Sequence, residues 1–204
     1  MKGVARPVGA VLCLAAAAFL VLLALDVRAW SSRFPADDLR YRRDASAARL
    51  WRVHPLAGSV AQHLLGASDD LEYRRALRDF RLGRPTEPIN RPAITSHRIA
   101  AQVELAEVAD SAADPARRSQ VDNLLGVLAY ALGAQDVAAR KAFLNNAITA
   151  FQDATVLDPS NDDAFYNLEY ALDQIRGSGE QQAPGSSEFG HRGHAGLKPP
   201  GQGY

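Results

Sequence analysis

The sequence contains a single cysteine, Cys13. A lone thiol cannot form a disulfide within the chain, and cysteine usage therefore says nothing about the redox compartment. Strand patterns are absent as well, because the valine, isoleucine and aromatic residues recur at helical intervals and not in alternation. The formal net charge is zero, which disfavours nucleic acid as a partner. These absences favour an all-α protein.

Catalytic and cofactor-binding patterns are also missing. The chain has no Gly-rich phosphate loop, no GxSxG and no HExxH. Among its histidines, only His191 and His194 are spaced closely enough to hold a metal, and then loosely. Acid pairs such as Asp162-Asp163 suit helix starts, where the helix dipole favours negative charge. The sequence therefore predicts a protein that is not an enzyme and has neither a cofactor nor a metal site.

One long apolar run stands near the start of the chain. Val8 to Leu25 is 18 residues without a charge. As a helix it spans about 27 Å, close to the bilayer core of about 30 Å. The apolar run has more residues than the usual hydrophobic region of a signal peptide. However, Val27-Arg28-Ala29 offers small residues for cleavage. Residues 1–29 are thus predicted to be a membrane anchor, with a cleaved signal peptide as the alternative.

Charge divides the rest of the chain. Between Arg28 and Ala100, 14 Arg and Lys oppose 8 Asp and Glu, a balance of +6, whereas Ala101 to Arg176 has 5 against 12, a balance of −7. Residues 30–82 are therefore expected to be basic and close to the membrane. Their arginines are expected either to face solvent or to contact lipid phosphates. Three helices are expected here, over 37–53, over 55–65 and over 69–82 with Ser68 as its cap.

One glycine and three prolines fall within residues 83–92, which predicts an extended linker. A helical region is expected over 93–176. Asp114 is a predicted cap, because Pro115 after it suits the first turn of a helix. The apolar side of the helix before it is expected to carry Ile99, Val103 and Ala106, with either Leu105 or Ala109.

The most informative spacing lies near the end of this helical region. Ala147, Phe151 and Ala154 fall at i, i+4 and i+7, so they share one helix face. Pro159 ends that helix, because the residue before a proline is pushed out of the α region. Phe165 and Leu168 then resume an apolar face three residues apart.

This spacing resembles the second helix of a tetratricopeptide repeat passing into the first helix of the next. Leu125 and Gly126 resemble the Leu-Gly positions of a first repeat helix. However, Gly126 precedes Ala147 by 21 residues, and the family spacing is about 12. The extra residues around 133–140 imply a longer helix or a wider loop. The resemblance implies a surface that binds proteins, with a generic antiparallel helix pair as the alternative.

Residues 177–204 change in character, being rich in Gly, Pro, Ser and Gln. So few apolar residues cannot offset the entropy of ordering, which predicts a disordered tail. Its last residues form a compact recognition group, since two prolines preset an extended turn and a ring stands beside a carboxylate. The alternative is a tail that only solubilises the protein. The predicted docking residues are Pro199, Pro200, Gly201, Gly203 and Tyr204.

Four segments carry a wider resemblance: LLGASDDLEYRRALRDFR from Leu64, NLLGVLAY from Asn123, DPSNDDAFYNLEYAL from Asp158, and the final PPGQGY. They resemble singly membrane-anchored helical proteins encoded beside MoxR-type ATPases and von Willebrand factor A proteins in bacteria. The resemblance implies a scaffold or assembly factor for such partners in the bacterial inner membrane, and an anchor inserted like a signal sequence puts the soluble part outside. Two alternatives remain: a structural envelope component contacting headgroups and cell wall, and a cytosol-facing regulator.

Overall fold

The computed structural model describes residues 5–87 and 91–180 of the chain. Within these ranges the secondary structure is helical, with no strand. The all-α fold class is therefore confirmed. The predicted tail begins too early, because the last helix continues through Gly177 to Glu180; the rest of the tail lies outside the described residues.

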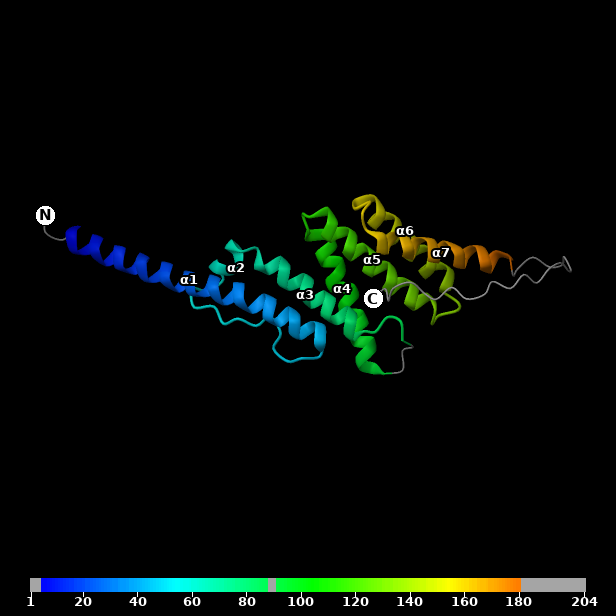
Figure 1. The fold of residues 1–204 in the computed structure, drawn as a ribbon, viewed down its shortest axis with the longest axis horizontal. Helices are drawn as coiled ribbons and strands as arrows, with labels where there is room; N and C mark the ends of the chain where they lie inside the picture. The colour runs from blue at the N-terminus through cyan, green and yellow to red at the C-terminus, as the bar shows by residue number, and fades with distance from the viewer. Residues whose placement is uncertain (1–4, 88–90, 181–204) are drawn as a thin grey trace. The chain divides into compact units, whose positions relative to one another are not determined.

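The chain divides into two compact units, Met1–Arg78 and Asp79–Tyr204. Figure 1 shows the order of the helices in both. The first unit holds α1 (Ala5–Arg43), α2 (Val60–Leu64) and the greater part of α3 (Ala67–Leu82); the second holds α4 (Pro92–Ser111), α5 (Pro115–Gly133), α6 (Arg140–Leu157) and α7 (Asp162–Glu180). The boundary falls inside α3, slightly before the linker that the sequence suggests.

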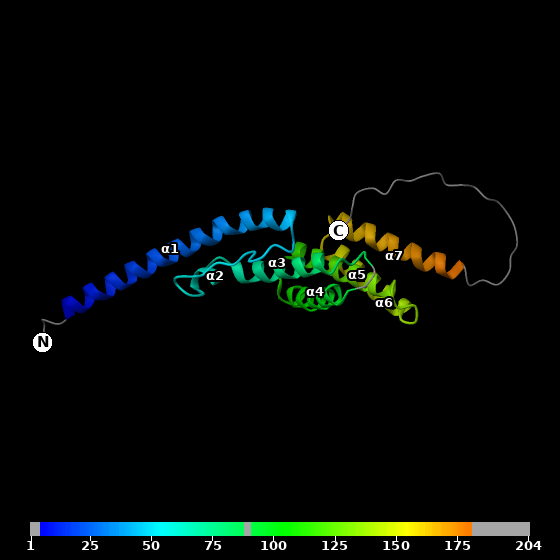
Figure 2. The same cartoon turned by 90° about the horizontal axis from the view of Figure 1, so that it is seen from below.

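α1 contains the apolar run and is, among the described residues, the one helix long and apolar enough to cross a membrane. Its apolar side chains are exposed, as in Leu14 at 71% and Val11 at 65%. In Figures 1 and 2 the N-terminal half of α1 continues alone, while α2 and α3 lie beside its C-terminal half. The core of this unit joins the two tryptophans, Trp30 and Trp51, to Leu50, Ala61 and Leu71.

The helix predicted over 37–53 is wrong beyond Arg43. α1 is continuous to that residue, and residues 44–59 then form a non-helical strap. Asp44 begins the turn, since its carboxylate accepts hydrogen bonds from the Ser46 N–H (2.8 Å) and hydroxyl (2.6 Å). Trp51 adopts a left-handed conformation, with φ of 54°, that no helix accommodates. The strap exists because carboxylates on α1 bind its backbone.

The next predicted helix, 55–65, is also mostly wrong. Only α2 is helical in it, because Gly58 before it and Gly66 after it have φ of 68° and 59°, which suit glycine and interrupt the helix. α3 begins at Ala67, so Ser68 lies in its first turn and is not its cap. Leu71 and Phe80 are buried on α3.

The predicted core face of α4 is right at Leu105, which is fully buried, and wrong at its other positions. Ile99 and Val103 are exposed. The buried face instead follows a regular i, i+4, i+7 spacing in which one position is an arginine. Arg98 is buried because its guanidinium binds the preceding segment: Nε donates to the Gly83 carbonyl at 2.7 Å, and Nη2 to the carbonyls of Arg84, at 2.6 Å, and Glu87. The buried residues are Ile94, Arg98, Ala101, Leu105 and Val108.

Candidate functional site

α5 packs more extensively on α6 than any other two helices pack on each other. The closest approach is at Gly126, where a Cβ atom would lie only 2.4 Å from Cε1 and 2.6 Å from Cδ1 of Phe151. Phe151 is 2% exposed, and the alanines on either side of it, Ala147 and Ala154, are fully buried. The Phe151 ring therefore lies directly on the backbone of α5. Leu125, beside the glycine, is only partly buried.

Residues 133–140 hold the end of α5, a loop and the first residue of α6. α5 extends to Gly133, where a Cβ would meet Cβ of Phe143 at 3.0 Å, and residues 134–139 then form the loop. Asp136 steadies the loop by accepting a hydrogen bond from the Ala139 N–H at 3.0 Å. α6 begins only after this loop, and Phe151 of α6 still lies opposite Gly126 of α5.

The predicted role of Phe165 as a packing residue is wrong, because its side chain is 43% exposed. The buried face of α7 runs through Ala164, Leu168 and Ala171 at i, i+4 and i+7, which places Phe165 on another side of the helix. Leu168 packs beside Phe151. Pro159 is exposed in the turn before α7, and the helix is capped by Asn161, which accepts from the Ala164 N–H at 3.1 Å.

A polar network that the sequence analysis missed fixes α7 on α5. The Ser119 hydroxyl, fully buried, donates to the Ala154 carbonyl at 2.7 Å and accepts from Nδ2 of Asn161 at 2.8 Å. One turn further along α5, Oδ1 of Asn123 accepts from Nδ2 of Asn167 at 2.9 Å. The sequence feature that could have predicted this network is the i, i+4 spacing of Ser119 and Asn123, which lie in line with the core face of α5.

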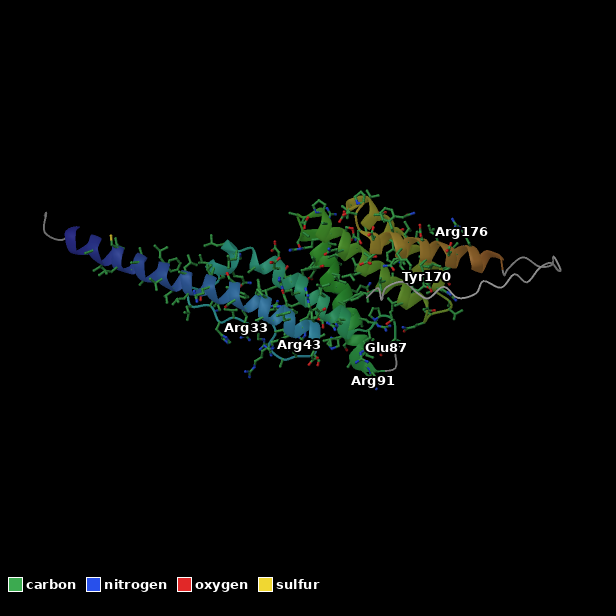
Figure 3. The ribbon with its side chains drawn as sticks, in the orientation of Figure 1. Arg33, Arg43, Glu87, Arg91, Tyr170 and Arg176 are labelled. Carbon is green, nitrogen blue, oxygen red and sulfur yellow. The ribbon has the colours of Figure 1, made fainter. Side chains whose placement is uncertain are left out.

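The opposite side of α7 is exposed and combines aromatic rings with carboxylates. Its rings are those of Phe165, Tyr166 and Tyr170, and Figure 3 marks Tyr170 on this helix. Tyr170 also packs against Tyr130 of α5, with ring centroids 5.7 Å apart. We call this set the α7 surface; it comprises Asp162, Phe165, Tyr166, Glu169, Tyr170 and Asp173.

The electrostatics of this region are acidic. Burial raises the pKa of Tyr130 to about 12, and the hydrogen bond that its neutral phenol forms with Tyr170 contributes, so the phenol remains neutral at physiological pH. Asp173 is paired with Arg176 at 3.3 Å. The described ranges contain no group of three or more His, Cys, Asp and Glu that could hold a metal. Aromatic faces beside carboxylates are suited to bind the cationic side chains of another protein.

Replacing Asp122 by asparagine is expected to raise the melting temperature at pH 7 by about 1–3 °C. Burial raises the pKa of Asp122 above its ordinary 3.8, and the Asp153 carboxylate raises it further, against the effect of Arg118. The folded state therefore binds the proton more tightly than the unfolded state. The stability from this proton is complete below pH 3.8 and is lost as pH rises through the folded pKa. Thermal melts across this pH range check it, since the gain should vanish in acid.

Asp153→Asn is the matched variant for this measurement. It removes the same repulsion between carboxylates, so the two single gains should not add in the double variant. A melting temperature at pH 7 that stays level or falls in Asp122→Asn would contradict the assigned repulsion.

The docking residues predicted in the tail, from Pro199 to Tyr204, lie outside the described residues. The same holds for His191 and His194. In comparisons with known proteins, no family model, no curated protein and no solved structure matches this chain.

Proposed function

We propose that the protein is a non-enzymatic, membrane-anchored helical scaffold that binds other proteins. The observation that supports it most is the α7 surface. Three large aromatic side chains are exposed on one helix face, although alanines occupy the buried positions of the same helix. Aromatic side chains exposed together in this way are typical of protein-binding surfaces. The α5–α6 hairpin with α7 would act as a tetratricopeptide-type binding region.

The exposed apolar half of α1 supports the anchoring part of the proposal. A helix in the core of a soluble protein would bury these side chains, whereas a helix in lipid leaves them facing acyl chains. We propose one membrane pass in a bacterial inner membrane, with the soluble part on the outer side. The protein would thereby keep its binding surface tethered to the membrane.

The chemistry of the α7 surface suggests the class of partner. Carboxylates of Asp162, Glu169 and Asp173 accompany the rings, so a segment rich in Arg and Lys would be complementary. The resemblance to proteins encoded beside MoxR-type ATPases and von Willebrand factor A proteins makes those two classes the candidate partners.

The proposal is tested by recovering partners from detergent-solubilised membranes with the full chain. The variant Phe165→Ala/Tyr166→Ala should weaken binding about 10- to 30-fold, the effect of losing central aromatic contacts. Val156→Ala is the matched control, since Val156 is an exposed apolar residue of α6, outside the α7 surface. It should bind like the wild type, and all three proteins should melt alike. Equal recovery with the double variant would contradict the proposal.

The alternative is a structural envelope component. The excess of basic residues between Arg28 and Ala100 favours contact with lipid headgroups. This alternative gains support if Phe165→Ala/Tyr166→Ala loses no partner and the wild type sediments with purified cell-wall fragments.

A further inference from the structure

Asp26 is the first charged residue after the apolar run, yet it is only 1% exposed. Its carboxylate accepts hydrogen bonds from the Leu56 N–H, at 2.8 and 2.9 Å to the two oxygens, and from the Ala57 N–H at 2.7 Å. These bonds fix the end of the strap to α1 at the level where the apolar run stops. In both Figures 1 and 2, α2 and the loop leading into it lie beside α1 near the point where its N-terminal half continues alone.

The segment held there exposes large apolar side chains. Leu64 is 69% and Leu56 60% exposed, and Val60 and Leu65 are exposed as well. The core of the first unit makes no use of them. We call residues 55–65 the α2 tip. Four exposed large apolar residues within ten positions are unusual on a surface that faces only water.

The α2 tip contains no acidic residue. Residues 27–36 and 52–66 contain no Asp or Glu, and Arg28 and Arg52 are exposed. The carboxylate of Asp26 is enclosed by backbone N–H groups, and the first acids after the tip, Asp69 and Asp70, lie in the first turn of α3. An apolar surface beside exposed arginines is suited to the boundary between acyl chains and anionic headgroups.

The strap runs along α1 from the level of Asp37 to the level of Asp26. The Trp51 N–H donates to Asp37 at 2.8 Å, and Asp37 lies 11 positions beyond Asp26 on α1. On a helix this displacement is about 16 Å. Ala48, three residues before Trp51 in the strap, is exposed.

We propose that the α2 tip is a second membrane-contacting element, lying in the interfacial zone of the bilayer beside the spanning part of α1. Leu56, Leu64 and Leu65 enter the acyl boundary there, and Asp26 sets their depth. The bilayer is the assigned occupant because the tip continues the apolar surface of α1 at the level where that surface ends. This inference rests on the proposed membrane anchoring of α1.

The test uses the full chain carrying one nitrobenzoxadiazole-labelled cysteine at a time. The native Cys13, exposed in the apolar run, reports the anchor. In a Cys13→Ser background, Leu64→Cys reports the α2 tip and Ala48→Cys serves as the water-facing control. Both positions are exposed, so the substitutions leave the core intact. The proteins are reconstituted in vesicles of equal parts phosphatidylcholine and phosphatidylglycerol, with or without nitroxide-labelled lipid.

The expected result is that labels at Cys13 and at position 64 emit as in an apolar medium and lose most of their fluorescence to nitroxide lipid. The label at position 48 should stay water-like. A quenched Cys13 label with a water-like label at position 64 overturns this inference and leaves the anchor standing. A label at position 64 that is shielded from water but not quenched by lipid also overturns it, because a protein then covers the tip. An unquenched Cys13 label overturns the anchoring itself.

Discussion

Replacing Phe151 by alanine is expected to destabilise the second unit by about 3–5 kcal/mol, as measured for large-to-small changes in protein cores. The side chain is 2% exposed, and its ring fills the space over Gly126 that a Cβ atom would enter. Against a typical domain stability of about 5–15 kcal/mol, this is a large share. The melting temperature of the full chain in detergent, followed by circular dichroism at a helical band, should fall by more than about 10 °C.

The chain offers a matched control in Phe165→Ala, which removes the same ring from an exposed position of α7. Its cost should stay within about 0.5 kcal/mol. Gly126→Ala places a methyl group against the Phe151 ring and should also destabilise. In the double variant Gly126→Ala/Phe151→Ala the methyl group enters the vacated space, so the cost should be smaller than the sum of the two. Equal melting of the Phe151 and Phe165 variants would show that the α5–α6 contact is not the core.

The position of Phe151 was predictable because helix geometry alone relates it to its neighbours. Residues at i, i+4 and i+7 share a face in any α-helix, so two alanines and one ring at that spacing already indicate a close contact. The end of α6 was predictable in the same way from Pro159. Leu157 is its last residue, two before the proline. Local rules were sufficient here.

The rotation of α7 was not predictable from the same rules. An aromatic residue at Phe165 outweighs an alanine at Ala164 in any count of apolar residues, yet Ala164 is fully buried. The side that packs is chosen by the contact of Leu168 and Ala171 with the cluster around Phe151 and by the hydrogen bond from Asn167 to Asn123. Both depend on where α5 lies, which the sequence of α7 does not contain.

Arg98 shows a second reason why a helix face could not be predicted from the sequence. A charged residue is normally assigned to the solvent side, which turned the predicted face of α4 toward Ile99. The guanidinium is buried because carbonyls of the preceding segment accept its N–H groups. These bonds from Nε and Nη2 offset part of the cost of burying the charge, although Nη1 is buried without a hydrogen-bond partner among the described residues. Such partners cannot be recognised until the chain is folded.

The strap of the first unit escaped prediction for the same reason. Residues 44–53 contain helix formers, and nothing local forbids a helix there. Asp37 decides the outcome, because its carboxylate binds the backbone N–H of Trp51 across a turn of the chain. The conformation of residues 44–53 is therefore set by residues on α1, together with Arg78 of α3, which donates to the carbonyls of Ala45 at 2.9 Å and Ala47 at 3.4 Å.

Asp37→Ala is accordingly expected to destabilise the first unit by about 2–4 kcal/mol, because a buried backbone donor loses its charged acceptor. Asp37 is 1% exposed and accepts three hydrogen bonds: from the Trp51 N–H at 2.8 Å, from Nε of Arg33 at 2.9 Å and from Nη1 of Arg40 at 2.9 Å. The two arginines, about half exposed, can return to water. The Trp51 N–H cannot, and the left-handed backbone at Trp51 loses the bond that holds it.

Tryptophan fluorescence is the measurement of choice for this variant. The only tryptophans of the chain, Trp30 and Trp51, are both buried in the core of the first unit, so their emission reports on that unit. Asp37→Ala should shift the emission to longer wavelength and lower the midpoint of the thermal transition. Asp37→Asn is the matched control, since its amide oxygen can still accept from the Trp51 N–H and only the charge toward the arginines is lost. If Asp37→Asn were as damaging as Asp37→Ala, the ion pairs and not the Trp51 bond would hold the strap; if both matched the wild type, the strap would need neither.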